Sequence, residues 1–257
     1  MKGFVINLES ATDRLEHMER EFGRTSFDLV RVPAVNGRLL PLPLSGYAEL
    51  LYRWFHGRST NLGEVGCYLS HLRAFDHFLR SDDEYALICE DDIVLGPDFE
   101  EVVEAALTHS ADWDIVRLTG LGTGKGVPVR SFPSGHHLCV NFGRLKGAGV
   151  YLLNREAARR LVKSLLPMRL PFDHAIDREW VYGLRAASVL PFPASQTDGC
   201  FRTSIQASKA GRLGWKYRVF TTYPYQALNE LSRYFFRSCH YVFMGGPIAP
   251  RRGPRSS

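Results

Sequence analysis

In the stretch Tyr85-Ala86-Leu87-Ile88-Cys89-Glu90-Asp91-Asp92, a nearly unbroken apolar run passes directly into three acids. Such a run is typical of a central strand that is covered on both faces. In open α/β sheets, ligands bind in the crevice outside the carboxyl ends of the strands. The stretch therefore predicts a buried strand whose acidic end faces a crevice.

The segments around this strand alternate between strand-like and helix-like patterns. Short apolar or alternating runs predict strands at 4–8, 27–32, 114–118, 148–153 and 186–190. Amphipathic runs predict helices at 13–22, 61–80, 98–108, 155–166 and 173–182, with Ser10 or Thr12, Asn61 and Asp98 as their N-terminal caps. The Pro-rich stretch 40–51 is expected to be irregular. Strands that alternate with helices imply a layered α/β sheet.

Length and composition limit the class of protein. The chain has 257 residues, of which 45% are hydrophobic and 23% charged. These ordinary globular values exclude a chain that is disordered, collagen-like or coiled-coil throughout, and the length suits one α/β domain with at most a small appendage. No apolar run approaches the ~20 residues needed to cross a bilayer. Residues 1–9 turn polar too early for a signal peptide.

Charge divides the chain near residue 200. Residues 201–257 hold ten Lys or Arg and one acid, Glu230, whereas residues 1–200 hold 22 basic and 26 acidic side chains. We therefore expect a domain at 1–200 and a basic, aromatic C-terminal extension at 201–257. The last residues, 250–257, are expected to be disordered.

The extension interleaves cations with aromatic rings between residues 212 and 243. That combination suits an anionic bilayer interface, and it predicts docking to a membrane surface. Two alternatives stay open: a packed C-terminal subdomain whose cations are solvated, and a groove that binds nucleic acid.

The five cysteines, Cys67, Cys89, Cys139, Cys200 and Cys239, are odd in number and widely spaced. Because no CxxC pair occurs, the pattern argues against a disulfide framework and against a cysteine-based zinc site. We expect buried free thiols in a reducing compartment.

The acids that end the central strand repel one another, and partial burial makes that repulsion costlier. In an extended segment Glu90 and Asp92 point to the same side, because strand side chains alternate. Together they suit one hard ion with oxygen ligands, such as Mg²⁺ or Mn²⁺. The alternative is a solvated acidic turn or helix cap.

Several short motifs occur along the chain in a fixed order. They are Val5-Ile6-Asn7-Leu8 with Asp13-Arg14; Ala34-Val35-Asn36-Gly37; Gly63-Glu64-Val65-Gly66-Cys67 with Ser70-His71-Leu72; Glu90-Asp91-Asp92; Gly147-Ala148-Gly149-Val150-Tyr151-Leu152; and Pro171-Phe172-Asp173. This ordered set resembles the family 25 glycosyltransferases, the group that contains bacterial lipooligosaccharide galactosyltransferases and collagen galactosyltransferase domains. The resemblance spans residues 3–200.

The resemblance implies a GT-A-like nucleotide-sugar-binding mixed sheet flanked by helices. It also implies a metal-dependent, inverting transfer of a sugar, galactose from UDP-galactose, onto a lipooligosaccharide- or lipopolysaccharide-type glycan. Glu90 and Asp92 then contact Mn²⁺ (or Mg²⁺), and Asp91 contacts the nucleotide ribose. Such an enzyme is expected in the cytoplasm, peripheral on the cytoplasmic face of the inner membrane.

Cations near the donor are expected, because a departing nucleotide diphosphate carries extra negative charge that a divalent ion and nearby cationic side chains offset. Arg14 follows the first strand, and Lys146 precedes Gly147, where small residues let a ligand approach the backbone. The alternative for Arg14 and Lys146 is an ordinary solvated surface position.

The resemblance adds Asn7, Glu64, Ser70 and His71 as donor-binding candidates. For Ser70 and His71, a structural role inside an apolar-faced helix stays open, and Glu64 can instead cap its helix. Gln196, in the loop after the last expected strand, is a candidate contact for sugar hydroxyls.

Inversion at a sugar carbon requires a base that takes the proton of the attacking hydroxyl. Asp173, at an expected helix start, is the first candidate, and the family pattern has an acid there. Asp177 lies four residues later on the same helical face and is the second candidate. A plain N-cap role for Asp173 is the alternative.

Two other patterns suggest known motifs but each lacks a residue that its motif requires. The glycine-rich loop 120–126 misses the spacing of a Walker A phosphate loop and is expected to be a flexible substrate loop. His136-His137 has no carboxylates at the spacing of metal ligands, which argues against a zinc site. The Ser, His and Asp residues of the chain show no nucleophile-elbow pattern.

Two rival functions stay open. A metal-dependent phosphohydrolase would need more scattered Asp and His ligands than the cluster Glu90–Asp92 offers. A non-enzymatic membrane- or RNA-binding protein would leave that cluster without a role. The expected partners are a nucleotide-sugar donor and a glycan or glycolipid acceptor, with an anionic membrane surface and no nucleic acid.

Overall fold

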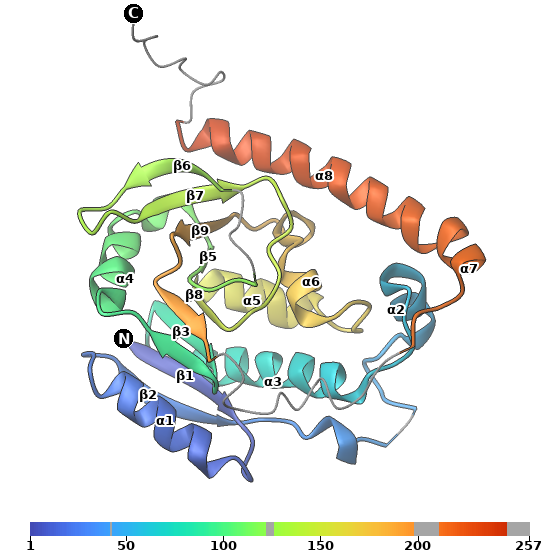
Figure 1. Cartoon of the computed structure of the whole chain (residues 1–257), viewed down its shortest axis with the longest axis horizontal. Coiled ribbons are helices and arrows are strands. Elements are labelled where there is room, and N and C mark those ends of the chain that lie inside the picture. The colour runs from blue at the N-terminus through green and yellow to red at the C-terminus, as the bar shows by residue number, and fades with distance from the viewer. Residues whose placement is uncertain (42, 122–125, 198–210, 246–257) are drawn as a thin grey trace, which may run out of the picture.

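A computed structural model describes residues 1–41, 43–121, 126–197 and 211–245 (Figure 1). Its centre is an eight-stranded sheet with the strand order β2-β1-β3-β8-β5-β9-β7-β6. The strands are β1 (Lys2–Asn7), β2 (Asp28–Pro33), β3 (Tyr85–Glu90), β5 (Ile115–Arg117), β6 (Gly126–Ser131), β7 (His137–Asn141), β8 (Val150–Asn154) and β9 (Ala186–Leu190). β1 is parallel to β2 and β3, whereas β8 is antiparallel to both β3 and β5.

Helices flank this sheet, so the predicted mixed α/β class is confirmed. They are α1 (Thr12–Phe22), α2 (Glu49–His56), α3 (Leu62–Leu79), α4 (Phe99–Thr108), α5 (Arg155–Ser164), α6 (Phe172–Ile176), α7 (Trp215–Phe220) and α8 (Thr222–Phe243), with 3₁₀ helices at Gly37–Leu39, Ser110–Asp112 and Glu179–Tyr182. A small second sheet pairs β4 (Ile93–Leu95) with β10 (Ala194–Gln196).

The central strand β3 is buried on both faces, which explains its continuous apolar run. Successive side chains of a strand point to opposite faces of the sheet. Ile88 joins the core that includes residues of α3 and α5, whereas Leu87 and Cys89 join the core that includes residues of α1 and α4. A strand covered on both sides leaves only its end for polar residues, and the acids begin at Glu90.

The predicted helix caps are right for one helix and wrong for another. Asn61 caps α3, since its side chain accepts from the backbone amide of Gly63 at 2.9 Å. Ala11 holds the N-cap position of α1, so the prediction that Ser10 or Thr12 caps this helix is wrong.

Asp98 occupies the N-cap position of α4, but its carboxylate makes no cap hydrogen bond and instead contacts a residue that is distant in the sequence. It lies 2.7 Å from His136 Nε2, and Nδ1 of the same ring lies 2.7 Å from the carbonyl oxygen of Pro191. Both ring nitrogens of His136 are therefore engaged by protein atoms.

Several elements escape the sequence patterns. α2 begins inside the stretch 40–51 that is expected to be irregular, and the helix expected at 173–182 is split into α6 and a 3₁₀ helix. The hairpin of β6 and β7 and the pair of β4 and β10 are also not predicted. These elements depend on partners remote in sequence, because α2 contacts α8 and β10 pairs with β4.

The C-terminal helix α8 lies along one edge of the molecule, where it contacts β7 and α2 (Figure 1). Parts of the chain that carry predictions lie outside the described residues: 122–125 of the glycine-rich loop, 198–210 with Cys200 and the expected domain boundary, and 246–257 with the segment expected to be disordered. None of the helices in the described ranges combines the length and the apolar character that a membrane span requires.

α8 turns two arginines toward the body of the protein. Arg237 is 3% exposed and donates to Glu179 at 2.8 Å, to Asp177 at 2.9 Å and to the carbonyl oxygen of Asn141 at 2.7 Å. Arg233 is 1% exposed and donates to Asp177 at 2.7 Å. These charge-assisted bonds tie α8 to the segment after α6. α8 is therefore packed against the body of the protein, and these two cations are buried rather than solvated.

We predict that Arg237→Ala lowers the free energy of unfolding by about 3–5 kcal/mol, because it leaves the Glu179 and Asp177 carboxylates buried without this partner. Urea unfolding followed by circular dichroism measures the loss. Arg80→Ala is the matched control, since Arg80 pairs with Asp76 at 2.8 Å on the exposed surface of α3. The expected loss there is below about 1 kcal/mol. Equal losses in the two variants would contradict the prediction.

Candidate functional site

A cavity of about 430 Å³ lies at the carboxyl ends of β1 and β3, where the sequence predicts a crevice. The antiparallel strand β8 brings its amino end to the same edge, and the carbonyl oxygen of Gly149 there accepts from the Glu90 amide at 2.7 Å. The candidate residues that line the cavity are Arg14, Glu64, Ser70, His71, Glu90, Asp91, Asp92, Gly147, Asp173 and Gln196. Most of the predicted site is thus brought together.

Three candidate residues lie away from this lining. Asn7 is 1% exposed and stands behind Asp91. Lys146 and Asp177 line a smaller adjoining hollow of about 30 Å³, which Asp173 also reaches. Lys146 is exposed there rather than directed at the three acids.

One wall of the cavity is made by main chain packed on main chain. A Cβ atom on Gly66 would lie 2.6 Å from the carbonyl oxygen of Val35, and one on Gly37 would lie 1.7 Å from the carbonyl oxygen of Leu62. The Ser70 hydroxyl joins the same two segments, because it accepts from the Val35 amide at 2.8 Å and donates to the Gly66 carbonyl at 2.7 Å. Ser70 therefore holds the wall in place.

Asp91, the middle acid, is neutralised by residues around the end of β1. Its carboxylate accepts from Arg14 Nη1 at 2.8 Å and from Asn7 Nδ2 at 2.9 Å. Arg31 Nε in turn donates to Asn7 Oδ1 at 3.1 Å. Arg14 and Asn7 thus anchor this acid, and Arg14 also lines the cavity.

Asp92 is the acid whose charge is least compensated. It is 8% exposed, and its Oδ1 has no hydrogen-bond partner among the residues that the structure describes. Burial, together with the negative charges of Glu90 and Asp91, raises the pKa of Asp92 to about 7, while Arg14 partly opposes this. A buried, unpaired carboxylate oxygen beside other carboxylates is the donor set that a hard divalent cation satisfies. Glu90 and Asp92 therefore fit the ion that the sequence implies.

Glu90 is held by a residue from the small second sheet. Gln196 Nε2 donates to Glu90 Oε2 at 3.1 Å, and Gln196 is aligned by the pairing of β10 with β4, opposite Ile93. The candidate for a sugar contact is thus hydrogen-bonded to a candidate metal ligand. No local sequence pattern reveals this contact, because the two residues are far apart in the chain.

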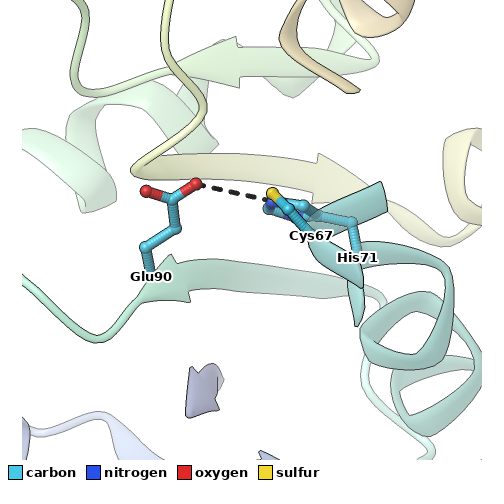
Figure 2. A group of neighbouring side chains, drawn as sticks. All are labelled: Cys67, His71 and Glu90. Carbon is cyan, nitrogen blue, oxygen red and sulfur yellow. Dashed lines mark ion pairs between the residues drawn. The ribbon is translucent and has the colours of Figure 1, made fainter. Parts of the chain in front are cut away.

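Figure 2 shows Glu90, from the end of β3, facing Cys67 and His71 of α3. One ligand atom of each lies within 4.8 Å of those of the other two. Burial, with the negative charges of Glu90 and Asp173, raises the pKa of the Cys67 thiol well above its usual value. Sequence reasoning overlooked Cys67, although its spacing of four residues from His71 on a helix was a usable signal.

The described cysteines are all free, as expected, but only some of them are buried. Cys89 and Cys139 are free and buried, but Cys239 is free and exposed on α8 and Cys67 is partly exposed. Burial is therefore correct for two of these four positions.

Glu64 lies in the first turn of α3. Its carboxylate contacts other side chains and does not cap the helix. It accepts hydrogen bonds from the Tyr52 hydroxyl and, at 3.4 Å, from Asn61 Nδ2, and it lies 4.0 Å from His56 Nε2. Because Asn61 supplies the cap, the Glu64 carboxylate can face the cavity that it lines.

Asp173 and Asp177 have different surroundings. Asp173, in the first turn of α6, accepts from the amides of Gly147 at 3.3 Å and His174 at 2.9 Å, and it lines the main cavity. Asp177 is 6% exposed and is bound by both buried arginines of α8. Pro171 holds the N-cap position, so Asp173 is not the N-cap. Asp173 alone of the two borders the acidic cavity.

Comparisons with known proteins agree with these motifs. Residues 1–125 match the family model described as "Glycosyltransferase family 25 (LPS biosynthesis protein)". A "Glycosyltransferase 25 family member" of Drosophila melanogaster is 33% identical over 219 residues, which are 75% of this chain and 34% of that protein. "Procollagen galactosyltransferase 1-B" of Xenopus laevis is 28% identical over 184 residues, 66% of this chain and 29% of that protein. The chain thus spans about a third of the length of these relatives.

Among solved structures, the chain is similar to a glycosyltransferase involved in the glycosylation of the major capsid of PBCV-1, with 13% identity and a TM-score of 0.41. That match covers 77% of this chain and 94% of the other. The family model over residues 1–125 and the curated relatives agree: the chain is similar to glycosyltransferase family 25.

Proposed function

We propose that this protein transfers a hexose from a nucleotide-diphosphate donor to a hydroxyl of a glycan acceptor. The observation that carries the proposal is the cavity of about 430 Å³ with Glu90, Asp91 and Asp92 at its floor; a buried oxygen of Asp92 has no hydrogen-bond partner among the described residues. Such a floor is suited to a diphosphate only through a bound cation, because carboxylates and phosphates otherwise repel each other.

Glu90 and Asp92 are the proposed ligands of Mn²⁺ or Mg²⁺. When bound, the ion would offset the negative charge that grows on the departing diphosphate. Arg14 lies beside the same acids and lines the cavity, so it adds positive charge near the leaving group. Asp91, which Arg14 and Asn7 hold in place, is the proposed contact for the nucleotide ribose.

Asp173 is the proposed general base of an inverting displacement. The acceptor hydroxyl would pass its proton to the Asp173 carboxylate as its oxygen bonds to the sugar carbon and the diphosphate leaves. Two backbone amides orient that carboxylate at the cavity wall. Asp177 is not proposed for this role, because its oxygens are taken by Arg233 and Arg237.

The donor proposed is UDP-galactose and the acceptor a lipopolysaccharide-type glycan. Support comes from the family description, which names lipopolysaccharide biosynthesis, and from the galactosyltransferase name of the Xenopus relative. A lipid-anchored acceptor lies at a membrane, so transfer to it would take place next to a membrane surface. The C-terminal helices α7 and α8 are the candidates for contact with that surface.

We further propose that the outward face of α7 and α8 docks on an anionic membrane surface from the cytoplasm. This face is apolar and exposed; its large side chains are Trp215, Val219, Phe220, Tyr223, Leu228, Leu231, Tyr234, Phe235, Phe236, Val242 and Phe243. Exposed apolar patches of this kind mark interaction sites. Arg212 and Lys216 are exposed at one end of it, and three further arginines follow α8 in the sequence. Excess positive charge favours anionic lipid over a second copy of the same chain.

We predict that Asp92→Asn lowers transfer by about 100-fold or more, because it removes a metal ligand that stabilises the leaving group. UDP release and the gain of one hexose by an acceptor glycan are measured with UDP-galactose and Mn²⁺. The melting temperature should stay equal or rise, since one of three crowded charges is gone. Asp76→Asn, on the exposed face of α3, is the control.

Near-normal transfer by Asp92→Asn would refute the metal role. Phosphate release without hexose transfer by the unchanged chain would favour the rival phosphohydrolase. A chain that is not stabilised against heat by any nucleotide sugar with Mn²⁺ would favour the non-enzymatic alternative.

We predict that Asp173→Asn lowers turnover by about 10²–10⁴-fold while donor affinity is kept, because the base acts on the acceptor and not on the donor. Titration calorimetry with UDP and Mn²⁺ measures the affinity, and initial rates measure turnover. A loss of donor binding as large as the loss of turnover would instead make Asp173 a binding residue.

We predict that the double variant Leu231→Ser with Phe235→Ser loses most binding to vesicles of anionic phospholipid, measured by co-sedimentation. Leu39→Ser with Leu166→Ser is the control, because both leucines are exposed and lie outside α7 and α8. Equal binding by the two variants would contradict the membrane proposal. A concentration-dependent dimer that only the α8 variant disrupts would show that a second copy covers this face.

A further inference from the structure

We propose that Cys67, His71 and Glu90 form a three-ligand site for a borderline transition-metal ion such as Zn²⁺ or Co²⁺ in the wall of the cavity. This inference goes beyond the proposed transfer reaction, in which Cys67 has no part. Their sulfur, nitrogen and carboxylate oxygen atoms all lie within 4.8 Å of one another. Figure 2 shows the three side chains converging from α3 and the end of β3.

The two helical ligands are four residues apart and therefore share one face of α3. Their positions follow from the packing of α3 on the sheet, which directs this face toward the end of β3. Glu90 arrives from the opposite side as the last residue of β3. Both elements belong to the rigid centre of the fold, so the ligands are preorganised.

His71 presents a buried nitrogen, Nε2, whose nearest charged neighbour is the Glu90 carboxylate. The residue has no exposed surface, and its Nε2 has no hydrogen-bond partner within the described ranges of the chain. Nδ1 lies 3.0 Å from the Tyr151 hydroxyl, and the ring stacks on Phe172 at 3.7 Å with an interplanar angle of 2°. With the ring proton on Nδ1, the lone pair of Nε2 points at Glu90 Oε1, 3.7 Å away.

Like His71, Glu90 has one polar atom that contacts a neighbouring side chain and a second one that faces the proposed ion. Gln196 Nε2 binds its Oε2, which leaves Oε1 directed at His71. In metal sites, the atoms of a ligand that do not touch the ion are usually held by such neighbours. Tyr151 and Gln196 supply these second contacts here, and each leaves one ligand atom facing the same point.

The chemistry of the three atoms selects the class of ion. A thiolate and an imidazole favour Zn²⁺ and related transition metals, whereas Mg²⁺ and Ca²⁺ prefer oxygen ligands. Three protein ligands leave a further coordination position, and Cys67, His71 and Glu90 all line the cavity toward which it would open. Because Glu90 is shared with the proposed Mn²⁺ site, occupation by Zn²⁺ would compete with the ion used for transfer.

Cobalt titration of the full chain tests the site, because a thiolate bound to Co²⁺ gives a charge-transfer absorption in the near ultraviolet that oxygen-ligated Co²⁺ lacks. We expect this band to saturate at about one ion per chain and to disappear when Zn²⁺ is added. Cys67→Ser should abolish it. Cys239→Ser, which alters an exposed cysteine of α8, should leave it unchanged.

Further variants separate this site from the proposed transfer. Glu90→Gln should weaken Co²⁺ binding by at least about 10-fold. Asp92→Asn should keep the cobalt band although it lowers transfer, so either proposal can fail alone. A band that is absent from the unchanged chain, or that persists in Cys67→Ser, would overturn the inference. Circular dichroism verifies that each variant is folded, and Cys67→Ala replaces Cys67→Ser if the latter is not.

Discussion

Repulsion among carboxylates at the end of a buried strand is the constraint around which this part of the fold is organised. β3 is covered on both faces, so its polar residues are confined to one end. Each of the three acids there has a different environment. Asp91 is paired with Arg14 and Asn7, Glu90 accepts from Gln196, and Asp92 keeps an unpaired oxygen among the described residues. The residual negative charge is thus concentrated where the cavity is.

The features that depend on local pattern could be predicted from the sequence. The apolar run of β3, the amphipathic face of α3 and the cap at Asn61 are encoded by residues close together in the chain. The edge at which the acids gather follows from the rule for carboxyl ends of strands. Glu90 and Asp92 are candidate site residues on that basis, whereas Asp91 and Asp173 are candidates through the family resemblance, and all four line one cavity.

The features that depend on distant partners could not be predicted. Gln196 reaches Glu90 only because β10 pairs with β4, and nothing near Gln196 signals that pairing. The sequence pattern predicts that the C-terminal cations face an anionic membrane or, in the alternative of a packed subdomain, water. Arg233 and Arg237 are instead buried against Asp177, so the apolar side of α8 is the one left exposed. Charge counts along a sequence do not tell which face of a helix turns inward.

The contact between Gly37 and Gly66 limits how the pocket of this protein can change. Where backbone meets backbone, there is no side chain to exchange, and even a methyl group would force the two segments apart. This part of the pocket therefore keeps a constant shape whatever substitutions accumulate nearby. A change of the pocket's shape would have to come from the remaining rim, where Arg38 and Leu121 contribute side chains to the lining.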